Sequence, residues 1–422
     1  MTEARRPYDA LFGGAIIELE PANGLRLNAS VFEAWDQNLL AEFTSPNTSS
    51  ALRVSGAYTN LLGDLTYTRR TARFQVAAVA GGNARYYSNV NAFAANDYHG
   101  GGGVALRPTA STTMAVNQSL SYAPVYLFGL FADALPVPLG NVASLDSAFA
   151  VSDDRAVTTN SSAELEQRLT ARTLLALKGD FMRSHFTVVS PRGTDFSSVS
   201  ASGDYRYRLT QDNDLRLGYT YRQASFQGTE PFGLRPQQPA EHNLHLGVVF
   251  HPALSDRRRT IVTFEGGTSL VNSAISSEPF TLRRQLRLVG DATVAHQMAE
   301  TWLLVGAVKR GTGFVQGLGA PVFTDAVSVT ASGFFNRRTD LLTSVAYSNG
   351  EPSLVGSVVT FSTTSANARL RVALTSRWAF ISEYVFYHYD FSKVLPLAAG
   401  LDPRVKRNTI RAGITLWMPV RR

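Results

Sequence analysis

Histidines and carboxylates are the residues of this chain that could support catalysis or metal binding, and seven histidines are present. Two of them, His242 and His245, stand three residues apart in the stretch Glu241–His245. Successive residues of a strand alternate between its faces, so residues three apart point to opposite sides. Two histidines can share a metal only when they lie on one face. We therefore predict no metal site here and no cofactor for the chain.

A second pair, His388 and Asp390, stands two residues apart and therefore on one face of a strand, near its outer end. Such a pair could provide acid–base catalysis in a hydrolase at the rim of a membrane barrel. No further catalytic partner can be identified, and hydrogen-bonded rim residues are the commoner outcome. We predict that the chain is not an enzyme, and a rim-located membrane hydrolase stays an alternative.

The run Gly100–Gly103 follows His99 but lacks the Gly-Lys-Ser/Thr ending of a phosphate-binding loop, and no helical pattern follows it. Phosphate-loop chemistry is therefore excluded for this stretch. We predict instead a strand that bends sharply or that a neighbour approaches closely.

Charged residues recur at alternate positions, as in Arg206 and Arg208 or Arg369 and Arg371. Alternate residues of a strand share one face. Rows of fixed charge along a water-filled pore bias ion passage, and a surplus of arginine favours anions. This chemistry requires long strands with one hydrated face.

The stretch Asn408–Val420 has the pattern of such a strand. Ile410, Ala412, Ile414, Leu416 and Met418 fall on one face, and Arg411, Gly413, Thr415 and Trp417 fall on the other. The facing of Trp302–Lys309 and Leu341–Tyr347 is ambiguous. The same clear alternation recurs in Leu25–Val31, Phe74–Arg85, Ala201–Leu209, Leu215–Arg222 and Ala366–Val372.

Short connections alternate along the chain with longer ones rich in Gly, Pro, Ser and Asn; Thr170–Arg172 is short and Gly228–Ala240 is long. About eighteen strand-like segments lie between them, an even number that places both termini of the chain on the periplasmic side. Bacterial outer-membrane barrels have this arrangement of short periplasmic turns and longer extracellular loops. We predict an all-β fold: a single transmembrane antiparallel up-and-down β-barrel domain over residues 1–422, with an N-terminal periplasmic segment at 1–22 and the barrel at 23–420.

The composition excludes several other classes. Apolar residues make up 44 %, but the mean hydropathy is −0.06 and no apolar run of about eighteen residues occurs, which excludes a transmembrane helix but not a barrel. The net charge of +7 comes from Lys and Arg spread along the chain, so we predict no nucleic-acid partner. The absence of cysteine removes thiolate metal sites and cysteine nucleophiles.

A soluble all-β protein such as a propeller is the alternative fold. Propeller blades have short strands and a repeat of about forty residues, and no such repeat occurs. A charge in the middle of the apolar face of a barrel costs roughly 2–4 kcal/mol, and the clear strands carry none there. Trp35, Trp302, Trp378 and Trp417 lie towards segment ends, where we predict an interfacial aromatic girdle.

The closing segment Arg407–Val420, the internal segment Tyr122–Phe131 and the segment Asp64–Arg70 resemble the outer-membrane barrels grouped as β-barrel porin type 2. The resemblance covers nearly the full length. It implies an outer-membrane pore, and some of these barrels pair with periplasmic export proteins to pass polysaccharide out of the cell. The chain departs from many porins at Arg421–Arg422, where they carry a terminal aromatic residue.

Assigning the polar faces of the strands to the interior gives a predicted pore-lining set. Its charges could leave an arginine surplus, or they could pair with one another and only stabilise the wall, and the sequence leaves both open. An interior of about eighteen strands is too wide for wall side chains to fill, and Gly129–Asp153 is the predicted constriction. The set comprises Arg26, Arg85, Arg168, Arg206, Arg208, Arg216, Arg222, Arg287, Arg369, Arg371, Arg411, Asp204, Glu265 and Asp291.

We predict a passive transport conduit in the bacterial outer membrane, with secreted polysaccharide as the favoured cargo. The expected partners are outer-membrane lipid, lipopolysaccharide and a periplasmic polysaccharide-export protein. A general diffusion porin for small, preferably anionic solutes is the alternative.

Overall fold

The computed structural model describes residues 23–37, 55–87, 92–124, 155–186, 195–226, 238–250, 253–255, 258–274, 282–298, 301–314, 321–352, 360–390 and 404–421. The strands are β1 (Gly24–Asp36), β2 (Gly56–Arg70), β3 (Phe74–Tyr87), β4 (Ala92–Leu106), β5 (Thr112–Pro124), β6 (Arg155–Arg168), β7 (Thr173–Phe186), β8 (Phe196–Arg208), β9 (Asn213–Phe226), β10 (Ala240–Phe250), β11 (Ala253–Ser255), β12 (Arg258–Ala274), β13 (Leu282–Met298), β14 (Trp302–Gly313), β15 (Val322–Asn336), β16 (Thr339–Pro352), β17 (Phe361–Ala373), β18 (Trp378–Asp390) and β19 (Arg404–Arg421).

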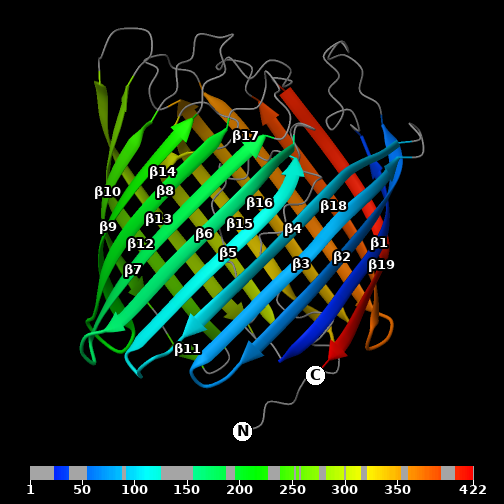
Figure 1. Ribbon diagram of the computed structural model, residues 1–422, viewed down its shortest axis with the longest axis horizontal. Coiled ribbons are helices and arrows are strands. Elements are labelled where there is room, and N and C mark those ends of the chain that lie inside the picture. The colour runs from blue at the N-terminus through cyan, green and yellow to red at the C-terminus, as the bar shows by residue number, and fades with distance from the viewer. Residues whose placement is uncertain are drawn as a thin grey trace.

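These strands form one antiparallel sheet of 19 strands, which closes because β1 pairs with both β2 and β19. β11 has only 3 residues and lies in the connection between β10 and β12, which pair directly. The wall therefore consists of eighteen long strands, tilted around a closed ring (Figure 1). The predicted all-β antiparallel up-and-down barrel is confirmed.

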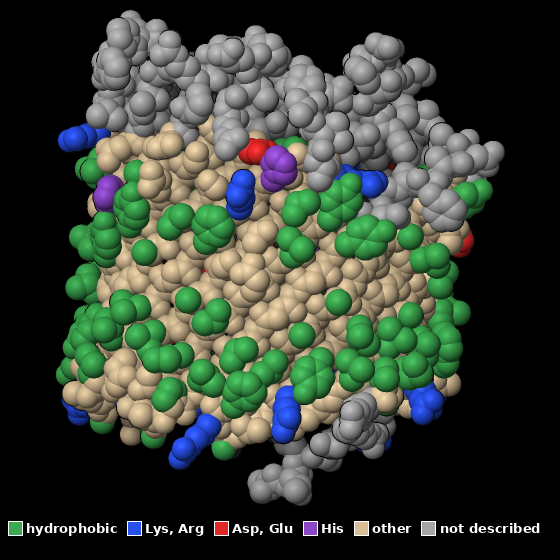
Figure 2. Space-filling model, viewed as in Figure 1, with side chains coloured by type: hydrophobic (Ala, Val, Ile, Leu, Met, Phe, Trp, Pro, Cys, Tyr) green, Lys and Arg blue, Asp and Glu red, His purple; other side chains and the backbone are tan. Residues whose placement is uncertain are grey.

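Alternation along each strand gives the barrel two distinct faces. On β5, Val116 and Leu120 are 57 % and 52 % exposed, and Asn117 and Ser119 point the opposite way. Residues directly opposite on neighbouring strands share a face, so Ala163 of β6 lies on the same side as Val116. Figure 2 shows hydrophobic side chains spread over the outside of the barrel, with Lys and Arg near its rims. We call this side the outward face and the other the inward face.

Short connections join neighbouring strands at one end of the barrel, which we call the turn end. The opposite end is the loop end. Threonine hydroxyls order these turns. Thr170 Oγ1 accepts hydrogen bonds from the amides of Arg172 and Thr173, both at 3.1 Å, and Thr375 does the same for Arg377 and Trp378. A hydroxyl that binds nearby amides favours a tight turn over continued strand.

Buried hydrophobic side chains in the described parts of the chain form separate small clusters on the inward face. Ala34, Tyr58 and Tyr87 make one of them, and the two tyrosine rings lie 5.3 Å apart. No helix long and apolar enough to cross a membrane occurs among the described residues.

Neither a sharp bend nor a close approach by a neighbour, the two alternatives predicted for Gly100–Gly103, is supported. β4 pairs with β3 in continuous register through this run, opposite the small residues of Ala77–Ala80. A Cβ atom added to Gly100 would lie 3.7 Å from the Val79 carbonyl oxygen, an ordinary contact distance. The register shift between β3 and β4 lies instead between Asn83 and Arg85.

β14 separates from β13 before it ends, although it stays paired with β15 up to Gly313. β13 and β14 pair from Met298 and Trp302 up to Gly290 and Arg310, and both strands then continue without pairing to each other. Beyond this point the Thr312 carbonyl accepts a hydrogen bond from Arg222 Nη1 on β9 at 3.2 Å.

β9 and β14 are four strands apart in the sheet, which corresponds to about 19 Å around the wall. The contact from Arg222 to Thr312 therefore requires the end of β14 to lie inside the barrel. Phe314 packs there against Phe196, Ala224 and Phe226, on the inward faces of β8 and β9. The inward bend of β14 narrows the interior near the loop end.

Candidate functional site

All fourteen residues of the predicted pore-lining set lie on described strands, on the inward face. Arg369 and Arg371, for example, alternate with Ala368 and Leu370, which point outward. Their role in lining a conduit stays a prediction. Two groups on the inward face concentrate the charge: the β8–β13 group (Asp204, Arg216, His245, Glu265 and Asp291) and the β16–β19 group (Asp340, Arg369, Arg371, Glu383 and Arg411).

In the β8–β13 group, Asp204 contacts two basic side chains. Its Oδ1 atom lies 3.0 Å from Nε2 of His245, and its Oδ2 atom lies 3.7 Å from Nη2 of Arg216. Arg216 also forms an ion pair with Glu265. These four side chains are only 13–21 % exposed, so the pairs lie in a partly dehydrated part of the wall, where they are stronger than in bulk water.

Glycine on the strand between allows the aspartate and histidine to meet. Asp204, Gly218 and His245 lie directly opposite one another on β8, β9 and β10. A Cβ atom added to Gly218 would lie 2.1 Å from His245 Nε2 and 2.3 Å from Asp204 Oδ1. The hydrogen bond therefore passes directly over the glycine.

The same arrangement recurs on β2, β3 and β4. Asp64 Oδ1 and His99 Nε2 lie 2.9 Å apart, and Gly81 stands between them in register. A Cβ atom on Gly81 would lie 2.0 Å from Asp64 Oδ1. The inward face thus carries two Asp–Gly–His bridges, each spanning three strands.

Two acids of the β8–β13 group face each other. Glu265 and Asp291 are directly opposite on β12 and β13, an arrangement that is destabilising unless cations flank it. Arg216 pairs with Glu265, and Lys309 lies opposite Asp291 on β14. The row from Arg216 to Lys309 is therefore neutral overall.

In the β16–β19 group, both carboxylates are engaged by arginine. Arg371 Nε lies 3.0 Å from Asp340 Oδ1, and its Nη2 lies 2.5 Å from Oδ2. Arg411 Nε and Nη2 lie 2.8 and 2.5 Å from Glu383 Oε2. Asp340 and Glu383 are 2 % and 8 % exposed. Arg369 lies opposite Glu383 on β18, yet it forms no ion pair with a carboxylate of the described residues.

Most of the predicted arginines are paired, which favours the reading that lumen charges stabilise the wall. Arg206 lies 3.7 Å from Glu166, and Arg222 lies 3.4 Å from Glu241. Arg287 reaches from β13 to Glu351 on β16. Within the described residues, ion pairs occupy Arg206, Arg208, Arg216, Arg222, Arg287, Arg371 and Arg411.

Sequence reasoning based on charge missed neutral polar residues on the inward faces of β5, β6 and β8. β7 lies between β6 and β8 and carries the ion pair of Lys178 and Asp180 on the same face. The neutral residues carry hydroxyl or amide groups and point inward, and alternation alone could have found them. They bond sparingly to each other; Asn117 Nδ2 lies 3.4 Å from Ser162 Oγ. These residues, which we call the neutral wall, are Asn117, Ser119, Ser121, Thr158, Asn160, Ser162, Ser198, Ser200 and Ser202.

The histidines lie where the strand pattern places them. His242 and His245 point to opposite faces: His242 Nδ1 lies 2.7 Å from the outward Tyr219 hydroxyl, and His245 bonds inward to Asp204. His388 and Asp390 share the outward face near the loop end, where Asp390 forms an ion pair with Arg404 at 3.0 Å. No group of three or more His, Asp or Glu in the described residues could hold a metal ion.

Three of the four tryptophans of the predicted aromatic girdle lie on the outward face, and the girdle itself stays a prediction. Trp35 and Trp378 are exposed on the outward face, and Trp302 packs edge-on against the outward Phe335 at 5.2 Å. Trp417 is different, because it points inward and packs against Ala373 and Ala379. The predicted constriction at Gly129–Asp153 and the predicted segment at 1–22 lie outside the described residues.

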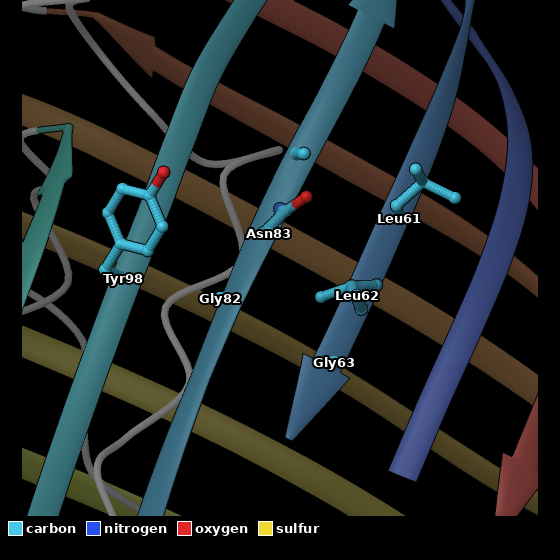
Figure 3. Close-up of a pocket in the computed structure, with 7 residues that line it drawn as sticks. Leu61, Leu62, Gly63, Gly82, Asn83 and Tyr98 are labelled. Carbon is cyan, nitrogen blue, oxygen red and sulfur yellow. The ribbon is translucent and has the colours of Figure 1, made fainter. Parts of the chain in front are cut away.

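A hollow of about 340 Å³ lies in the wall on β2, β3 and β4. Gly63 and Gly82 stand opposite each other there, and the ring of Tyr98 borders the space (Figure 3). A Cβ atom on Gly82 would lie 3.1 Å from that ring. The hollow has no charged residue in its lining, and Asn83 contributes a polar side chain beside Leu61 and Leu62.

No family model matches the chain, and no curated protein sequence matches it. The resemblance to β-barrel porin type 2 therefore stays a prediction. Among solved structures, the chain is similar to OccK2 (OpdF) of Pseudomonas aeruginosa in complex with glucuronate, with a TM-score of 0.47 and 10 % identity over 96 % of this chain and 100 % of that one.

It is also similar to OpdQ of Pseudomonas aeruginosa, with a TM-score of 0.45 and 9 % identity over 94 % of this chain and 98 % of that one. A bacterial polysaccharide outer membrane secretin gives a TM-score of 0.38 and 8 % identity over 94 % and 99 % of the two chains. At these identities and TM-scores, we assign neither a ligand nor an activity to this chain from them.

Proposed function

We propose that the chain is a transport conduit in the bacterial outer membrane and not an enzyme. Eighteen long strands close into a ring, exposed hydrophobic side chains cover its outside (Figure 2), and charged and hydroxyl side chains face inward. Lipid outside and water inside satisfy both faces, and closure leaves no sheet edge in the hydrocarbon. The short connections at the turn end fit the periplasmic side.

We further propose a carbohydrate cargo, with secreted polysaccharide as the favoured case. The neutral wall on β5, β6 and β8 carries this proposal. Hydroxyl and amide groups such as Asn117, Asn160 and Ser202 can donate and accept hydrogen bonds with sugar hydroxyls, and they add no net charge. A periplasmic polysaccharide-export protein at the turn end is the proposed partner.

A diffusion porin for small anionic solutes is the second candidate. One observation favours it: cationic side chains on the inward face of β7 and β8 are accessible, with Lys178 51 % and Arg208 58 % exposed. Exposed cations along a pore raise the local concentration of anions.

Ion conduction by the refolded protein in a planar bilayer tests the conduit. We expect steady current steps that a neutral oligosaccharide such as maltohexaose interrupts. Ser202→Trp should lower the conductance, because position 202 faces inward, whereas Ala201→Trp should leave it unchanged, because Ala201 is exposed on the outward face. Silence from a demonstrably folded barrel would contradict an open conduit. Anion-selective current without interruption by the sugar would favour the diffusion porin.

A further inference from the structure

Arg369 differs in its bonding from the two other arginines of the β16–β19 group. Arg371 and Arg411 each bond a carboxylate through two nitrogen atoms. The Nε atom of Arg369 is buried and has no hydrogen-bond partner, and its guanidinium forms no ion pair with any carboxylate of the described residues. Its side chain is nevertheless partly exposed on the inward face.

The carboxylates next to Arg369 are already engaged. Asp340 accepts from Arg371 on both oxygens, and Glu383 holds Arg411 on Oε2. Three guanidinium groups against two carboxylates leave one formal positive charge in this group. On its other side Arg369 lies opposite Leu342 of β16, which offers no polar contact.

A partly dehydrated guanidinium without a bonded anion is unfavourable, and an incoming oxyanion removes that penalty. Arginine presents a planar fork that matches a carboxylate or a phosphate group. Arg369 stands four residues from Ala373, the last residue of β17, or about 13 Å along the strand from the turn end. A cargo that enters from that end would reach it early.

We propose that Arg369, framed by Arg371 and Arg411, binds an acidic group of the cargo: an oxyanion such as the carboxylate of an acidic polysaccharide. This inference rests on the proposed function, because it assigns the anion to a cargo that moves through the barrel. It also separates two neighbouring arginines by role, since Arg369 binds cargo and Arg371 holds the wall together.

Calorimetric titration of the detergent-solubilised protein tests this site directly. The probes are an oligogalacturonate, a neutral maltooligosaccharide of equal length, and inorganic phosphate. Arg369→Gln should weaken oligogalacturonate binding about tenfold or more, because a hydrogen bond to a charged group is lost. The matched control Arg208→Gln removes the same charge from an exposed inward position and should change binding less than about twofold.

Equal losses of oligogalacturonate affinity in Arg369→Gln and Arg208→Gln would show a general electrostatic attraction and not a specific site, which would overturn the proposal. Unchanged binding in Arg369→Gln would also overturn it. Binding of phosphate without oligogalacturonate would overturn the cargo assignment. Arg369→Lys keeps the charge without the fork and should bind with intermediate affinity, which controls for any folding defect in the glutamine variant. Titration also separates the site from the conduit: Arg369-dependent binding without current would contradict only the open pore, and current with Arg369-independent binding would contradict only the site.

Discussion

Asp204 and His245 meet because Gly218 between them has no side chain. The same holds for Asp64, Gly81 and His99 on β2, β3 and β4. A strand glycine normally weakens a sheet, because it packs nothing and loses more backbone entropy on folding. At these two positions that cost is offset by a hydrogen bond between strands that are not neighbours.

Gly218→Ala should lower the free energy of unfolding by about 1–3 kcal/mol, because its Cβ atom would overlap the bridge and leave buried polar groups unpaired. Urea titration of the barrel in lipid vesicles, followed by tryptophan fluorescence, measures this. Gly306→Ala is the matched control, since a Cβ atom at Gly306 meets nothing within 4 Å. It should be neutral or stabilise by up to about 1 kcal/mol. Equal effects of both substitutions would show that the bridge contributes no stability.

For single residues, the sequence predicted which face of a strand each side chain lies on, but not which other side chains it bonds to. Alternation placed Arg216, Glu265 and Asp291 on one face, as the structure has them. Which of them bond depends on the register between strands that are far apart in the chain, and a one-residue shift changes every partner. His245 was recognised only as pointing away from His242, because its bond to Asp204 crosses an intervening strand.

Among the strands, β13 and β14 form the irregular part of the wall. β14 separates from β13 at Gly311-Thr312-Gly313, and these three residues stay paired with β15. On the outward face beside this separation, Leu286 and Leu288 are 71 % and 73 % exposed, more than any other large hydrophobic side chain in the described parts of the chain.

Because the chain contains no cysteine, introduced cysteine pairs can test directly whether β13 and β14 separate beyond Gly290 and Arg310. If β13 and β14 stayed paired, Val289 and Gly311 would be the next register pair after Gly290 and Arg310. We expect Val289→Cys with Gly311→Cys to form little disulfide under mild oxidation. Thr293→Cys with Ala307→Cys, a true register pair on the same inward face, should form it readily. Equally efficient bonding in the two double variants, measured by mobility on a denaturing gel, would show that the wall is continuous.

The same region explains why the phase of Trp302–Lys309 was ambiguous in the sequence. Val305 and Ala307 point inward and are 2 % and 5 % exposed, and Ala307 packs against Ala326 of β15. Because both faces of β14 are apolar here, the alternation that marks a strand with one wet face is lost. A sequence pattern reveals the two faces of a strand only when one face meets water and the other does not. Here the inward face of β14 is buried against neighbouring side chains.

For the whole molecule, the sequence predicted the number of strands from the connections between them. The pairing of β1 with β19 in the structure shows that the barrel closes. The alternation of short and long connections predicted about eighteen strands, and β11 escaped notice because 3 residues carry no periodicity. The inward bend of β14 could not be predicted, since Phe314 finds Phe196 and Phe226 only after the barrel has closed. Closure brings together residues that no local pattern connects.

The membrane orientation of the entire barrel can be tested with two adjacent residues of β5. Val116 points outward in the middle of the strand, next to Val104 and Ala163, and Ala115 points inward beside Glu164. Val116→Arg should destabilise the barrel in phosphatidylcholine vesicles by roughly 2–4 kcal/mol, because a cation at mid-depth must enter hydrocarbon. Ala115→Arg should cost less than about 1 kcal/mol, since it meets water and a carboxylate. Urea-dependent folding into the vesicles measures both, and detergent micelles provide a second medium. If the two variants lost the same stability, the outward face would not be the lipid face, and the proposal of an outer-membrane conduit would fail with it.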